Sequence, residues 1–155
     1  MKKLTFILFT FTVTFWIISC SGTGSSEQES SETDSVSTEM TSAKVYFISP
    51  NDGDTVSSPL MIDMGLEGME IDPAGEVKEG MGHHHLVING SHIQEGVVVP
   101  TDSVHIHYGL GQIRDTVELA PGNYTLTLQF ADGFHQSYGK PLSSTINVVV
   151  KDNNQ

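Results

Sequence analysis

Short runs in which apolar and polar residues alternate follow one another from Lys44 to Lys151, each ended by Gly, Pro, Asn or Asp. Side chains two residues apart on a strand point to the same face of its sheet, so this alternation predicts strands. No segment shows the apolar period of an amphipathic helix. The strands that we expect span residues 45–48, 60–66, 84–88, 97–99, 104–108, 113–119, 124–130 and 145–150.

This succession of strands and turns predicts an all-β fold, an immunoglobulin-like antiparallel β-sandwich of about seven or eight strands. Asn89-Gly90 is a strong tight-turn pair. Pro121-Gly122 marks the entry into a late strand, where we expect a tyrosine-corner-like hydrogen bond from Tyr124. Residues 65–82 form the long connection, and long loops on sandwiches often carry function.

The start of the chain has the composition of an export signal. A basic Met1-Lys2-Lys3 precedes an apolar run from Leu4 to Ile18, which is too short for a bilayer span. The run ends in Ile18-Ser19-Cys20, which resembles the lipobox of bacterial lipoproteins. The resemblance implies that residues 1–19 are a lipoprotein signal peptide and that Cys20 becomes the lipidated N-terminus. An uncleaved anchor or an ordinary secretory signal is the alternative.

The domain organisation that we expect has three further parts. Residues 20–43 are rich in Ser, Thr and Glu and contain no aromatic residue, which predicts a disordered tether. Residues 44–151 form the sandwich domain, and residues 152–155 form a polar tail. Such a protein would be held in the bacterial cell envelope by membrane lipid through Cys20, facing the periplasm or the cell surface.

Charge and cysteine content exclude several classes of function. Cys20 is the only cysteine, so its acylation would leave no thiol for a disulfide or for catalysis. Loss of Lys2 and Lys3 from the 7 basic residues would leave 5 against 19 acidic ones, a formal charge of −14. This charge argues against nucleic acid as a partner and favours the attraction of cations.

All seven histidines lie between His83 and His135. On a strand, His83 and His85 share one face, and His105 and His107 likewise point away from the core together. Side-chain origins two residues apart are roughly 6.5–7 Å apart, a workable span for two imidazoles that bind one ion. If the two strands are neighbours, the four histidines form a quartet, to which a loop brings His135.

Imidazole favours Cu(II) and Zn(II), and thioethers would extend the site to Cu(I). We therefore predict a transition metal site, with copper favoured and zinc second. Its affinity should fall below about pH 6, where free imidazoles protonate. The predicted metal ligands are His83, His85, His105, His107 and His135, with Met69 and Met81 as additional soft ligands.

Other residues of these types have simpler interpretations. His84 is expected to face the core and donate a ring proton to a buried carbonyl, and His92 to lie on the surface. Met61 and Met64 are expected to fill the core. The chain contains neither a Gly-x-Ser-x-Gly elbow nor a His-Glu-x-x-His pair, and no two carboxylates are marked by spacing as acid and base. We therefore expect no enzyme.

Parts of the chain resemble two protein families. The runs Gly82-His83-His84-His85-Leu86 and His105-Ile106-His107-Tyr108-Gly109 resemble domain-of-unknown-function family 4399, and the likeness extends from residue 65 to residue 150. It implies an exported single-domain protein without a settled activity. More loosely, residues 119–125 and 131–135 resemble the last strands of CopC-like copper-resistance proteins, which are β-sandwiches. That likeness implies copper and maps one ligand, His135.

The predicted function is therefore metal binding for sequestration or delivery, with a metal-donor or metal-acceptor protein as partner. The alternative is a non-catalytic immunoglobulin-like binding module for a protein or glycan partner, in which the histidines are structural. A metal-dependent enzyme with an open coordination position is the third and least favoured interpretation.

Overall fold

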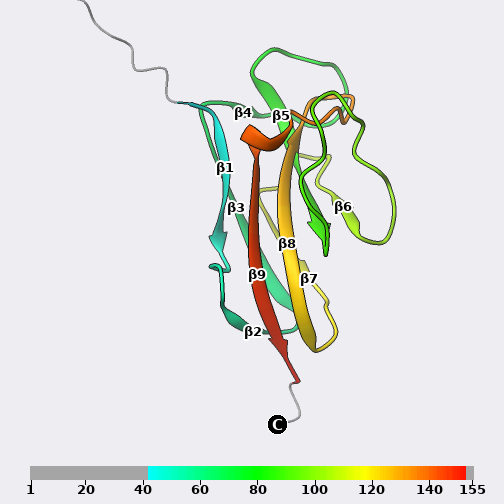
Figure 1. Ribbon diagram of the computed structural model, residues 1–155. Coiled ribbons are helices and arrows are strands. Elements are labelled where there is room, and N and C mark those ends of the chain that lie inside the picture. Colours follow the sequence, from blue (N-terminus) through cyan, green and yellow to red (C-terminus); the bar gives the residue numbers. More distant parts are fainter. Residues whose placement is uncertain (1–41, 153–155) are drawn as a thin grey trace, which may run out of the picture. The chain divides into compact units, whose positions relative to one another are not determined.

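The computed structural model describes residues 42–152, which form a sandwich of two β-sheets (Figure 1). The smaller sheet has the order β1-β3-β7, and the larger has the order β2-β9-β8-β5-β4, with β6 also paired to β5. The strands are β1 (Lys44–Ser49), β2 (Thr55–Ser57), β3 (Leu60–Glu67), β4 (Glu70–Ile71), β5 (Met81–Ile88), β6 (His105–His107), β7 (Arg114–Val117), β8 (Gly122–Ala131) and β9 (Ser143–Lys151).

The predicted all-β sandwich is confirmed. With β1, β3 and β7 in one sheet and β5, β8 and β9 in the other, the strands have the arrangement of an immunoglobulin-like sandwich. The described residues contain nine strands. Two of them, β2 and β4, were not predicted from the sequence, because each is a parallel pairing too short to show alternation. The segment 97–99 contributes a single bridge, from Val98 to Gln136, rather than the predicted strand. The expected tyrosine-corner-like bond is present, since the Tyr124 hydroxyl donates to the Ala120 carbonyl at 3.0 Å.

All nine strands belong to one compact unit, Thr38–Gln155. The predicted signal peptide, the lipidated Cys20 and the tether up to residue 41 lie outside the described residues. Within residues 42–152, no helix has the length and apolar character needed to span a membrane.

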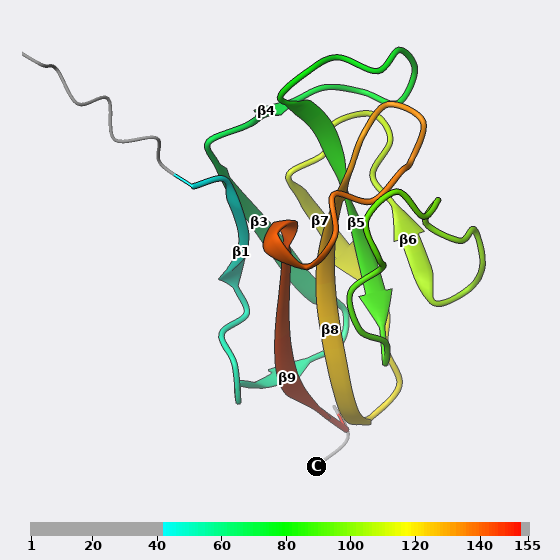
Figure 2. The same cartoon turned by 45° about the horizontal axis from the view of Figure 1, so that its top comes forward.

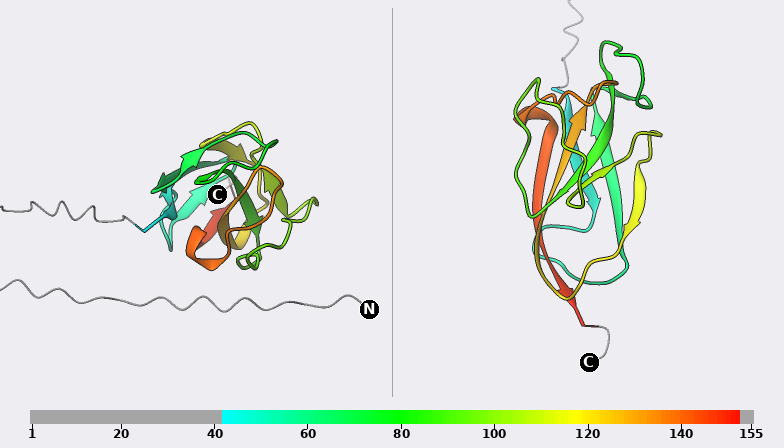
Figure 3. Two further views of the ribbon diagram at one scale, coloured as in Figure 1. Left: turned by 90° about the horizontal axis from the view of Figure 1, so that it is seen from above. Right: turned by 90° about the vertical axis from the view of Figure 1, so that its right-hand side faces the viewer.

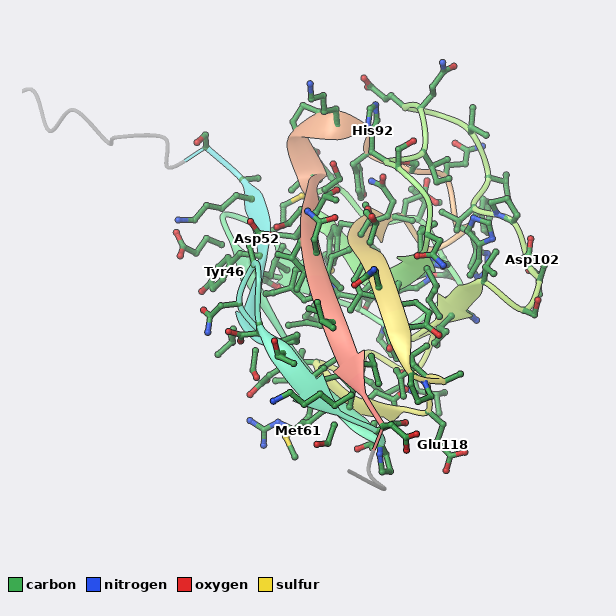
Figure 4. The ribbon with its side chains drawn as sticks, turned by 60° about the horizontal axis from the view of Figure 1, so that its bottom comes forward. Tyr46, Asp52, Met61, His92, Asp102 and Glu118 are labelled. Carbon is green, nitrogen blue, oxygen red and sulfur yellow. The ribbon has the colours of Figure 1, made fainter. Side chains whose placement is uncertain are left out.

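The two sheets enclose one apolar core between them (Figure 3). Alternate residues of β8, including Leu126, Leu128 and Phe130, are fully buried and belong to the same cluster as Met64. The prediction that Met61 also fills the core is wrong. Its side chain is 53% exposed and points outward in Figure 4, because β3 alternates and buries the residues on either side of it.

The outer face of the larger sheet is buried over half its length. Two segments cover it, residues 91–101 and residues 132–139, which we call the covering loops (Figure 2). They are joined by backbone hydrogen bonds from Val99 to His135 and from Ser137 to Val97, both 2.9 Å. Gln129 of β8 ties both loops to the sheet. Its side-chain oxygen accepts from the backbone of residue 93, and its amide group donates to the carbonyls of residues 139 and 142.

Candidate metal centre

The pairing of β5 with β6 brings the two histidine runs together. His85 lies opposite His107, and His105 lies opposite Val87. The backbone hydrogen bond from Tyr108 to His84 shows that the His85–His107 pair is a non-hydrogen-bonded one, in which side chains approach most closely. The two rings accordingly stack, with centroids 5.0 Å apart and planes 25° apart.

Four imidazoles converge on the outer side of this strand pair, under the covering loops. The Nε2 atom of His83 lies 3.1 Å from that of His85 and 3.2 Å from that of His107. The Nε2 atom of His107 lies 3.1 Å from that of His135. We call His83, His85, His107 and His135 the imidazole cluster. It joins two predicted ligands of β5, one of β6 and the predicted loop ligand.

Hydrogen bonds between the rings account for only part of the contacts in this cluster. Each neutral Nε2 atom carries either one hydrogen or one lone pair in the ring plane, so it makes one hydrogen bond. The contacts form a chain, His85–His83–His107–His135, in which both inner nitrogens touch two neighbours. When donors and acceptors alternate along the chain, each contact pairs unlike groups, but each inner nitrogen must then share its single hydrogen or lone pair between two neighbours. At most two of the three contacts can therefore be full hydrogen bonds, whereas a cation between the nitrogens would bind a lone pair of each ring.

A metal ion fits the same distances. For metal–nitrogen bonds of 2.0–2.1 Å, two nitrogens of a tetrahedral site are about 3.3 Å apart. The ligand nitrogens of His83, His107 and His135 all lie within 4.8 Å of one another, and His85 adjoins them through His83. The donor set is therefore three imidazoles with a fourth beside them. His83 and His85 are buried, whereas His107 is exposed, so an ion would enter from the side of β6.

The loop after β8 holds His135 in place. The Asp132 carboxylate accepts hydrogen bonds from the backbone of Phe134 (2.8 Å) and of Gln136 (2.9 Å), which closes a tight turn around the histidine. Within this turn His135 has a left-handed backbone, with φ of 66°. Non-glycine residues adopt this conformation at some cost, which the surrounding hydrogen bonds offset. Asp132, which we did not predict as part of the site, therefore positions a cluster histidine.

Two glycines also shape the cluster, although the sequence alone assigned them no role in it. A Cβ atom on Gly109 would overlap the ring of His107, including its Nε2 atom. A Cβ atom on Gly82 would overlap the carbonyl of Ala131 and prevent β5 from approaching β8 next to His83. The signal that could have identified them is their position, since Gly82 directly precedes the first histidine run and Gly109 follows His107 by two residues.

His105, a predicted ligand, lies outside the imidazole cluster. Its Nδ1 atom is 2.7 Å from a carboxylate oxygen of Asp102, in the loop before β6 (Figure 4). The same oxygen accepts hydrogen bonds from the backbone of Val104 and of His105. The bond from the imidazole is the largest of the interactions that lower the pKa of Asp102.

Met69 and Met81, the predicted soft ligands, line a hollow beside the start of β5 together with Glu70 and Glu79. Met69 is also packed against the apolar core. Their participation in a metal site stays a prediction.

The core-facing position predicted for His84 is confirmed, but the hydrogen bond predicted for its ring is wrong. Its ring is fully buried on the core side of β5 and meets Phe130 edge-on, with centroids 5.2 Å apart. Neither ring nitrogen has a hydrogen-bond partner among residues 42–152, so it does not donate to a carbonyl there. The neighbouring strand β8 presents apolar residues to the ring of His84, and these side chains offer no hydrogen-bond partner.

Burial keeps these imidazoles neutral. Desolvation is the main cause that lowers the pKa of His83 and of His84 to about 4 and that of His85 to about 3. The neighbouring cluster histidines lower the pKa of His83 and His85 further. Desolvation also lowers the pKa of His107. A metal ligand must be unprotonated, so these shifts move the expected onset of proton competition below the pH of about 6 anticipated from free imidazole.

Replacement of His84 by leucine should stabilise the protein. The substitution removes two buried nitrogens without partners, each of which costs about 1–3 kcal/mol, and keeps an apolar side chain against Phe130. Urea denaturation of wild type and His84→Leu, both with a chelator, should show a higher free energy of unfolding in the variant. A lower value would mean that His84 has a polar role in the core.

Acid should destabilise the metal-free protein through the same histidines. In the unfolded chain they bind a proton near their ordinary pKa of 6.5, whereas in the folded domain His83 and His84 do so only near 4. Between these values the unfolded state binds more protons, so a fall in pH favours unfolding. The melting temperature in chelator should drop as the pH falls from 6.5 to 4. A melting temperature that stays constant over this range would contradict the burial of neutral imidazoles.

Sequence comparison identifies the family of the chain. A family model described as a domain of unknown function (DUF4399) matches residues 62–151, more than half of the chain and all of the imidazole cluster. No curated protein and no solved structure is significantly similar to the chain. The likeness to CopC-like proteins stays a prediction. The chain belongs to the DUF4399 family, as its two histidine runs predicted.

Proposed function

We propose that this protein binds a transition metal ion at His83, His107 and His135, with His85 as a fourth ligand. The observation that carries the proposal is the chain of Nε2 contacts of 3.1–3.2 Å, of which at most two can be full hydrogen bonds and which match the spacing of nitrogens around one bound ion. Copper is favoured and zinc is second, because both accept imidazole and divalent copper binds more tightly at a given nitrogen site.

The surroundings of the cluster support storage or transfer of the ion rather than its use in catalysis. The group of potential ligands in the described residues contains histidines alone, and the nearby Asp132 carboxylate is engaged by the backbone N–H groups of Phe134 and Gln136. Buried His83 and His85 are neutral at physiological pH, so they would bind the ion without first releasing a proton. The exposed His107 offers the edge at which a donor or acceptor protein would exchange the ion.

The purely structural interpretation of the histidines is less well supported. Buried polar atoms in folded proteins are paired in the great majority of cases. Here the Nε2 atoms of His83 and His85 meet only other imidazoles, and the three contacts of the chain cannot all be full hydrogen bonds. A scaffold role would leave these polar atoms buried without the stabilisation that hydrogen bonds normally supply.

Titration calorimetry of the segment 38–155 with Cu(II) and with Zn(II) tests the proposal. We expect one ion per chain with a Kd below about 10 µM. Loss of a residue that hydrogen-bonds to a metal ligand typically weakens metal binding about 10–100-fold. His107→Ala and His135→Ala each remove a proposed ligand itself, so each should weaken binding by more than that. His105→Ala and His92→Ala are matched controls, since each removes an imidazole outside the cluster, and both should bind as wild type.

Gly109→Ala extends the same titration, because it keeps every imidazole and displaces only the ring of His107. It should weaken metal binding while the chelator-treated variant still folds. Metal should also raise the melting temperature of wild type, since a ligand that binds only the native state stabilises it by about 2.7 kcal/mol at one hundred times its Kd. Equal affinities in wild type and His107→Ala would remove the proposed site.

The proposal places the domain at a membrane through acylation of Cys20, in a bacterial envelope facing the periplasm or the cell surface. The lipobox-like end of the apolar run and the absence of any other cysteine support this placement. Expression of the full chain and of Cys20→Ser, followed by fractionation, tests it. Wild type should be found with the membranes and incorporate labelled palmitate, and the variant should do neither. Wild type in the soluble fraction without label would refute the anchor.

A further inference from the structure

The outer face of the larger sheet has a second, uncovered half. The covering loops bury Thr127 and Gln129 of β8, but they do not reach Asn123 and Thr125 further along the same face of that strand. A hollow lies at this uncovered end, lined by uncharged residues only, although the chain carries a formal charge of −12. The lining residues with polar side chains are Asn89, Asn123, Tyr124, Thr125 and Asn147. We call this site the amide hollow.

Internal hydrogen bonds set the orientation of the polar groups in the amide hollow. The backbone N–H of Thr125 donates to the side-chain oxygen of Asn89 at 3.1 Å. A backbone N–H can only donate, so the bonded atom of Asn89 must be its oxygen, and its NH₂ group is left as a donor. The Thr125 hydroxyl donates to the side-chain oxygen of Asn147 at 3.0 Å, which leaves the hydroxyl oxygen as an acceptor.

These bonds also hold the groups rigid. The backbone N–H of Asn147 donates to Asp52 at 2.7 Å, which anchors the β9 side of the hollow to the turn before β2. The hydroxyl of Tyr124 donates to the Ala120 carbonyl and the residue packs against the apolar core, which fixes this part of β8. Asn123 is exposed between these fixed groups and offers a further donor and acceptor. Polar groups held in place before binding lose less conformational freedom when a ligand arrives.

We propose that the amide hollow binds a neutral saccharide. A sugar hydroxyl both donates and accepts, so neighbouring hydroxyls match an amide donor beside a hydroxyl acceptor. The absence of charged lining residues gives the hollow no group that selects an ion of either sign. An extended peptide would bind by adding a strand to a sheet edge. Strands β8 and β9 each have neighbours on both sides, so their backbones are already paired.

Nuclear magnetic resonance titration of the segment 38–155 tests this inference. The probes are chitotriose, cellotriose and maltotriose, with the peptide tetra-alanine as the competing ligand class. Each trisaccharide is added to about 10 mM, a concentration that detects binding with a Kd near 1 mM. At least one of them should shift the backbone amide resonances of Asn89 and Thr125. Tetra-alanine should leave them unchanged. The absence of a shift with every trisaccharide, or an equal shift with the peptide, would overturn the inference.

Two variants separate a specific site from general surface binding. Asn123→Ala removes an exposed carboxamide without breaking the bonds between Thr125 and its neighbours, so it should fold and weaken saccharide binding at least about tenfold. Gln94→Ala removes an exposed carboxamide outside the hollow and should bind as wild type. Equal affinity in wild type and Asn123→Ala would refute the site. The imidazole cluster contributes no residue to the hollow, so these results do not depend on metal binding.

Discussion

Strand β5 is buried on both of its faces, and the rest of the site follows from that burial. Its core face carries Leu86, which needs only apolar neighbours, but its outer face carries His83 and His85. Polar rings removed from water must find partners or remain neutral. The covering loops that exclude water from this face also supply His135, and the neighbouring strand supplies His107. The burial and the assembly of the imidazole cluster therefore come from the same packing of loops on the sheet.

The architecture could be predicted from the sequence because strand alternation records which face is buried. The long strands β3, β8 and β9 lie close to their predicted bounds. The covering loops could not be predicted, because their contacts are long-range hydrogen bonds such as those of Gln129, and such bonds leave no periodic pattern. The strands β2 and β4 could not be predicted from the sequence either, because each consists of two or three residues defined by their pairing alone.

For the histidines, the alternation in the sequence predicted which residues share a face of the sheet, but not the register in which β6 pairs with β5. It set His105 and His107 on the same side of one strand, and the structure agrees. Which of the two meets His85 depends on how β6 is aligned with β5, and a shift along the strand would exchange their roles. The Asp102 carboxylate, which binds the backbone of Val104 and His105, fixes the loop that enters β6. The alignment thus depends on a polar loop contact outside the strand itself.

The choice of imidazole rather than carboxylate follows from the same desolvation. An unpaired carboxylate under the covering loops would carry its charge into a site without water, at a cost of several kcal/mol. A neutral imidazole enters such a site more easily, as the low pKa values of His83 and His85 show, and it keeps a lone pair for a cation. The Asp132 carboxylate lies near enough to offset the positive charge that an ion would bring. The largely buried Asp132 favours positive charge at His83 through their Coulomb interaction, while its hydrogen bonds hold the turn of His135. One carboxylate beside the cluster, rather than within it, thus serves both the geometry and the charge of the site.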